Sequence, residues 1–191
     1  MDITKLITEQ LNDPNLLKTL GKAVGADASQ VREVTGLGLP ALLEALGRNA
    51  GSPDKASALA KALDQHQDDD VDDLESFLGK VDTTDGAKML QHIFGNSNEK
   101  VQQNLAGTAG LDTSQVSGIL AQLAPLLLGS LGQQKKKQNM DITDIAGLLG
   151  GLSKQSAGGG MMGMVSELLD SDNDGSIMDD VGNLLGRFMK K

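Results

Sequence analysis

The segment Asp170–Val181 carries the most specific chemical pattern in the sequence. Three aspartates alternate there and a glycine follows the third, which is the front half of an EF-hand calcium loop. Calcium takes six to eight oxygen ligands at loose geometry, so carboxylates on alternate residues of a tight loop can converge on it. The pattern therefore predicts a Ca²⁺ site with these ligands: Asp170, Asp172, Asp174, the backbone carbonyl of Ser176, and Asp180.

The end of this loop departs from the usual pattern. Gly175 stands where the sharp left-handed turn needs a residue without a Cβ, but Val181 stands where a bidentate glutamate is expected. One residue is missing between the apolar Ile177 and the following acids. We therefore expect a loop one residue shorter than usual that is closed by Asp180, with Asp179 as the second candidate.

The same acids have a simpler interpretation as helix caps. Aspartate and asparagine readily form Asx-turns and cap helices, and an amphipathic helix is expected to follow the loop. Capping accounts for one or two acids and not for three that alternate ahead of a glycine. The apolar face of the expected exit helix consists of Ile177, Val181, Leu184, Leu185 and Phe188.

Composition narrows the class of protein. The chain has 191 residues, a net charge of −9 and no cysteine, which excludes disulfides, thiolate nucleophiles and zinc–thiolate sites. The acidic balance argues against nucleic acid as the main partner and favours cations or basic surfaces. The longest apolar run, Ile119–Leu131, is too short and too interrupted for a membrane span. No secretory signal opens the sequence, so we expect a cytoplasmic protein.

Apolar residues recur at helical spacing along the chain and strand signals are almost absent, which predicts an all-α fold. Repeated Leu-Gly pairs are typical of helix C-caps. Pro40 should break or kink its helix near Gly38. We expect helices over residues 2–11, 14–24, 27–37, 40–46, 53–63, 85–94, 99–105 and 141–149.

A helical unit occurs twice. The segment that begins at Asp27 matches the one that begins at Asp112, and the match continues without a gap through Pro40 and Pro125 to a Leu-Gly pair in each copy. Duplicated helical units are expected to stack or pair. The predicted organisation is a duplicated domain over 1–137 (copies about 14–65 and 99–137), a helix and Gly/Ser-rich linker over 138–160, and an EF-hand-like helix-loop-helix over 161–191.

An acidic segment at 64–74 resembles the calcium loop in its spacing. His66 takes the place of the second aspartate and Asp69 takes the place of the loop glycine. A side chain at that left-handed position costs roughly 1 kcal/mol or more, so we expect a degenerate sister loop that does not bind calcium tightly. An acidic helix start, favoured by the helix dipole, is the simpler alternative.

Residues 20–34 and 105–120 both resemble a helix-turn-helix. The first copy offers only Arg32 beside Glu33, and the second has no charged residue from Thr113 to Leu128, so packing without DNA is the preferred interpretation. The basic run Lys135–Lys137 is expected at a helix C-terminus. The two histidines, His66 and His92, lie in no nucleophile–base pattern, and no phosphate-binding loop is present, which predicts a protein without enzymatic activity.

Several segments together resemble a bacterial family of uncharacterised proteins, the domain of unknown function 937, to which the YidB-like proteins belong. The resemblance covers nearly the whole chain and implies an all-α, homeodomain-like arrangement without assigning an activity. The segments that carry it are 40–50, 63–74, 86–95, 110–126 and 170–181.

These observations lead to one main hypothesis and one alternative. The first is a calcium-binding helical structural or interaction protein, whose partner is a protein or a second copy of the chain. The alternative is a helical adaptor that contacts DNA through its helix-turn-helix-like units and uses the terminal loop as a structural clasp.

Overall fold

The computed structural model describes residue 3 and residues 13–156, with side chains described up to residue 153. Every regular element in this part of the chain is helical, which confirms the predicted all-α class. In order, the elements are α2 (Pro14–Val24), α3 (Ala28–Gly51), α4 (Pro53–His66), α5 (Leu74–Leu78), α6 (Thr83–Phe94), the 3-10 turn η2 (Gly95–Ser97), α7 (Asn98–Ala109), α8 (Thr113–Gln138) and α9 (Ile142–Ser156).

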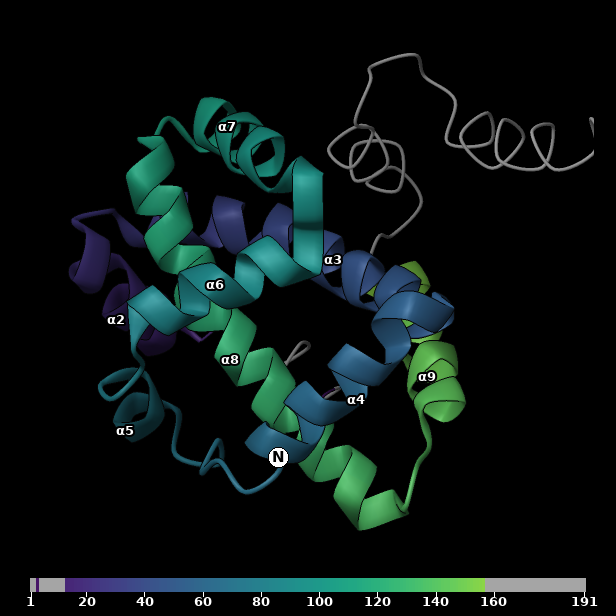
Figure 1. Cartoon of the computed structure of the whole chain (residues 1–191). Helices are drawn as coiled ribbons and strands as arrows, with labels where there is room; N and C mark the ends of the chain where they lie inside the picture. Colours follow the sequence, from purple (N-terminus) through teal and green to yellow (C-terminus); the bar gives the residue numbers. More distant parts are fainter. Residues whose placement is uncertain (1–2, 4–12, 157–191) are drawn as a thin grey trace, which may run out of the picture.

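Helix α8 lies at the centre of the fold. Every residue from Ile119 to Gly132 is buried, and α2, α3, α4, α6 and α7 pack around it (Figure 1). A helix that is apolar on all sides has to be covered in this way. By length and composition α8 could also cross a membrane, but 83% of its apolar window is buried inside the protein, and core helices commonly pass that test.

Helix starts agree with the capping residues of the sequence. Asp13 caps α2, where its Oδ1 accepts the backbone N–H of Asn15 at 2.7 Å, and Pro14 occupies the first turn. Asp27 and Asp112 occupy the N-cap positions of α3 and α8. Gly25 ends α2 at φ 70°, a left-handed conformation in which a residue with a Cβ is strained.

Of the break or kink expected near Gly38, the break is wrong and the kink stays a prediction. α3 runs uninterrupted from Ala28 to Gly51, and α8 likewise continues through Pro125. A proline inside a helix removes one backbone hydrogen bond. Burial offsets this loss, because both prolines lie inside long buried stretches of their helices.

Most Leu-Gly pairs are not C-caps, contrary to expectation. Gly79 does end α5, but Gly21, Gly47 and Gly132 lie inside helices. A Cβ on Gly132 would lie 2.5 Å from the carbonyl oxygen of Leu63, where α4 crosses α8. These glycines therefore serve close helix contacts, which the Leu-Gly pattern alone does not distinguish from a cap.

Two of these contacts occupy matching positions. Gly132 of α8 meets Leu63 of α4, and Gly47 of α3 meets Leu149 of α9, whose Cβ would lie 3.6 Å from an added Cβ. Helix α4, which follows α3, thus crosses α8 at Gly132. In the same way α9, which follows α8, crosses α3 at Gly47. α3 and α9 share an extensive interface, so α9 belongs to the same helical body.

The tightest crossing joins α6 to α8. A Cβ on Gly86 would overlap the carbonyl oxygen of Ala121. That carbonyl receives no bond from the residue four positions later, because Pro125 has no N–H. The proline therefore deprives the Ala121 carbonyl oxygen of its usual helical hydrogen bond at the point where Gly86 comes closest.

We predict that Gly86→Ala destabilises the fold by about 1–3 kcal/mol or more, because the new methyl group has no room against the α8 backbone. Gly36→Ala is the matched control, since Gly36 is also inside a helix and has open space around its Cα. The control should be neutral or stabilising by about 0.5–1 kcal/mol. Urea unfolding of both variants measures the difference, and equal midpoints would contradict the proposed crossing.

Candidate functional site

The five predicted calcium ligands lie outside the described residues: Asp170, Asp172, Asp174, Ser176 and Asp180. The predicted helix-loop-helix unit over 161–191 lies outside them as well. The predicted linker is helical in its first part, because α9 continues to Ser156. Leu152 and Ser153 are buried near the end of this helix, so packing against the core extends it beyond the predicted end at residue 149.

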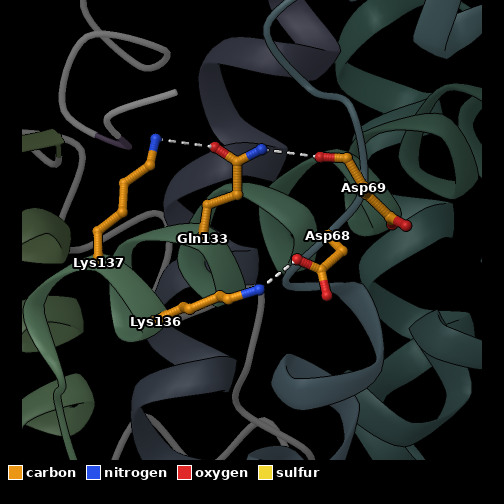
Figure 2. A network of polar contacts seen from close by, with 5 residues as sticks. All are labelled: Asp68, Asp69, Gln133, Lys136 and Lys137. Carbon is orange, nitrogen blue, oxygen red and sulfur yellow. Dashed lines mark hydrogen bonds and ion pairs between the residues drawn. The ribbon is translucent and has the colours of Figure 1, made fainter.

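The acidic segment 64–74 bonds to the C-terminal part of α8. Lys135 Nζ lies 2.6 Å from Asp64 Oδ1, and Lys136 Nζ lies 2.5 Å from Asp68 Oδ1. Figure 2 shows the second of these ion pairs beside a hydrogen bond of 2.8 Å from Gln133 Nε2 to the backbone carbonyl of Asp69. Three side chains of the last turns of α8 therefore bond to this segment: Gln133, Lys135 and Lys136.

Other members of the segment have separate partners. Asp69 Oδ2 lies 2.7 Å from His66 Nδ1, and Asp73 caps α5 by accepting the Ser76 N–H at 3.1 Å. Val71 is fully buried and lies against Gly129 of α8. The segment is therefore held by an apolar anchor with ion pairs and hydrogen bonds around it.

This arrangement does not form a calcium loop. Asp69 is not among the residues with positive φ, so the left-handed turn expected at the glycine position of such a loop is missing here. No group of three or more His, Asp or Glu side chains that could hold a metal ion occurs in the described part of the chain. That 64–74 does not bind calcium tightly stays a prediction.

The basic run Lys135–Lys137 is engaged within the protein. Two of its lysines pair with aspartates, and Lys137 Nζ lies 3.3 Å from Gln133 Oε1 (Figure 2). These cations also lie in the last turn of α8, where the helix dipole favours positive charge. The position agrees with the expected helix C-terminus.

Two glutamines at equivalent positions connect the two helix-turn-helix-like segments. Gln30 Nε2 donates to the carbonyl oxygens of the last residue of α7 and the next glycine, at 3.4 and 3.2 Å. Gln115 Nε2 donates to the carbonyl oxygens of the last residue of α2 and the next glycine, at 3.1 Å each. We call Gln30 and Gln115 the reciprocal glutamine pair.

The same side chains also cap their own helices. Gln30 Oε1 accepts the Asp27 N–H at 3.1 Å, and Gln115 Oε1 accepts the Asp112 N–H at 3.0 Å. Each glutamine therefore uses its oxygen locally and its amide N–H groups on the other segment. The sequence match already contained both residues, but only the fold reveals that they reach across to each other's segment.

We predict that Gln115→Glu lowers the free energy of unfolding by about 1–3 kcal/mol. The carboxylate still accepts the cap hydrogen bond, but the two donated bonds are lost, at about 0.5–1.5 kcal/mol each. Gln103→Glu is the control, because Gln103 donates only to Glu99 on the exposed surface of α7. Like charges four residues apart cost about 0.2–0.5 kcal/mol. Chemical denaturation compares the two, and equal losses would contradict a role for the pair.

Comparison with known proteins gives a family and nothing more specific. The matching family model is described as a bacterial protein of unknown function (DUF937), and it covers residues 5–134 and 136–190. No curated protein and no solved structure matches the chain. The second matched segment includes the predicted calcium loop. Because the match spans nearly the whole chain, the chain belongs to the DUF937 family of bacterial proteins of unknown function.

Proposed function

We propose that this protein is a non-enzymatic helical scaffold that binds calcium through the terminal loop at 170–180. The alternation of Asp170, Asp172 and Asp174 ahead of Gly175 carries this proposal. The described core supports it indirectly, because four acids of 64–74 each have a separate partner: Asp64 and Asp68 pair with lysines, Asp69 with a histidine, and Asp73 caps a helix. The loop at 170–180 is therefore the better candidate for converging carboxylates.

The scaffold is proposed to consist of two copies of one three-helix unit. Helices α2, α3 and α4 correspond to α7, α8 and α9, and the first two pairs begin within one residue of the offset that joins Asp27 to Asp112. The reciprocal glutamine pair and the two glycine crossings follow the same correspondence. These features support an approximate two-fold arrangement in which each unit completes the core of the other.

The polar groups of the core support binding rather than catalysis. His66 pairs with Asp69, and the ring of His92 has no polar partner among the described residues. Neither histidine contacts a hydroxyl group there, and such a contact is what a nucleophile–base pair requires. We propose that the partner of this scaffold is another protein or a second copy of the chain.

We predict that calcium raises the melting temperature of the full chain. Ligand that binds only the folded state adds about 2.7 kcal/mol at a hundredfold excess over Kd. Asp174→Ala should abolish the gain, and Asp180→Ala should reduce it more than Asp179→Ala if the shortened loop is correct. Magnesium should substitute poorly, because it demands a tighter octahedral geometry.

Asp70→Ala is the matched control for this experiment. Asp70 is an exposed aspartate of the segment 64–74, so its loss removes an acid without touching the terminal loop. The calcium-dependent shift of this variant should equal that of the wild type. An unchanged melt of the wild type in calcium, or a loss caused by Asp70→Ala alone, would refute the assignment to 170–180.

The DNA-associated alternative has less support from the described contacts. Gln30 and Gln115, at the starts of the would-be recognition helices, are bonded to backbone carbonyls. Lys135 and Lys136 are paired with aspartates, and the net charge of the chain is −9. Phosphate contacts are the main source of non-specific affinity, and the basic run at the end of α8 is already engaged within the protein.

We therefore predict no mobility shift of duplex DNA at low salt, where electrostatic binding is strongest. A variant in which Asp64 and Asp68 are both changed to asparagine is informative, because it releases Lys135 and Lys136 from their partners. Weak DNA binding by this variant alone would agree with the contacts described. A salt-dependent shift with the wild-type protein would favour the alternative.

A further inference from the structure

A cavity of about 350 Å³ lies between the end of α3, the exposed helix α4 and the second half of α6. Its floor is apolar and consists of Leu46, Leu59, Ile93 and Leu128, all buried. Ligand pockets are typically about 300–1,000 Å³, largely apolar, with a few placed polar groups. A volume at the lower end of this range fits a small molecule.

Asn49 is the buried polar group of this cavity. It is 8% exposed, and its Nδ2 donates to the backbone carbonyl oxygens of Ile93 at 3.0 Å and His92 at 3.4 Å. These bonds fix the orientation of the amide. The side-chain oxygen of Asn49 accepts no hydrogen bond from the described residues. This oxygen is therefore available to accept a hydrogen bond from an N–H group of a ligand.

Charges of both signs stand at the rim of the cavity. Asp54 and Lys55 are neighbours in the first turn of α4, and both line the cavity. Both are exposed, and neither forms an ion pair within the described part of the chain. A ligand with only one charge would lie beside a like charge as well as an opposite one. A molecule with a positive and a negative group matches both.

We propose that this cavity binds a small zwitterion with an apolar side chain, the chemistry of a free apolar amino acid. The ammonium group would donate hydrogen bonds to the side-chain oxygen of Asn49 and to the Asp54 carboxylate. The carboxylate group would pair with Lys55. The apolar side chain would lie on the floor formed by Leu46, Leu59 and their neighbours. This inference concerns the described core and does not depend on the calcium loop.

Calorimetric titration of the full chain in the presence of a chelator tests the proposal. Three probes are compared: L-leucine, 4-methylpentanoate, which lacks the ammonium group, and 3-methylbutylamine, which lacks the carboxylate. Leucine should bind at least about tenfold more tightly than either of the others. Each of the other probes lacks one charged contact, and a tenfold change in Kd corresponds to about 1.4 kcal/mol. Binding by one of the single-charge probes as tight as that of leucine would overturn the proposal.

Exposed substitutions separate recognition from folding. Asp54→Asn and Lys55→Gln should each weaken leucine binding about tenfold and leave the unfolding midpoint nearly unchanged. Asp85→Asn and Lys88→Gln are the controls, because they alter a neighbouring acid and base of α6 that do not line the cavity. The controls should bind leucine like the wild type.

Filling the cavity provides an independent check. Ala62 lines the cavity from α4 and is half-buried, so Ala62→Met places a larger apolar side chain in the space that the ligand would use. We expect this variant to stay folded and to lose leucine binding. The proposal is overturned if leucine does not bind the wild type at millimolar concentration, or if Ala62→Met and Lys55→Gln both bind leucine unchanged.

Discussion

The burial of α8 is the constraint on which the rest of this structure depends. A helix that is apolar around its whole circumference gains stability only where other helices exclude water from each of its sides. Helices α2 to α7 do so in the described part of the chain, and several of them come close because glycines lie at the crossings: Gly132 beneath α4 and Gly86 of α6 against Ala121. Close approach is needed because short distances between helices maximise the dispersion contacts that a Leu- and Ala-rich core can make.

Local signals in the sequence located the helix starts well. Asp13 with Pro14, Asp27 and Asp112 are capping positions whose effect is confined to one helical turn, so tertiary structure did not change them. Pro40 and the Leu-Gly pairs were misread because their effects depend on the surroundings. A proline breaks an isolated helix but not one buried on both sides of it. A glycine can end a helix, but inside a helix it can equally let a second helix pack closely.

The polar contacts of the described core also separate into features that local sequence predicts and features that depend on the fold. The acids of 64–74 were visible in the sequence, but their partners on α8 lie about seventy residues away in the chain (Lys135 with Asp64, Lys136 with Asp68). The separation excludes any prediction from local spacing. The reciprocal glutamine pair could have been suspected, since Gln30 and Gln115 occupy the same place in two matching segments. The direction of its N–H groups required the fold.

The comparison between 64–74 and 170–180 illustrates how similar acidic spacing can have different consequences. In the first segment Val71 packs on α8, and the aspartates around it are drawn outward to lysines, a histidine and the start of α5. Its carboxylates diverge, and Asp69 stands where a converging loop needs glycine. The second segment has that glycine and the full alternation of aspartates. Convergence of oxygen ligands requires a backbone that turns sharply, and this requirement, more than the number of acids, is what separates a charged surface segment from a calcium loop.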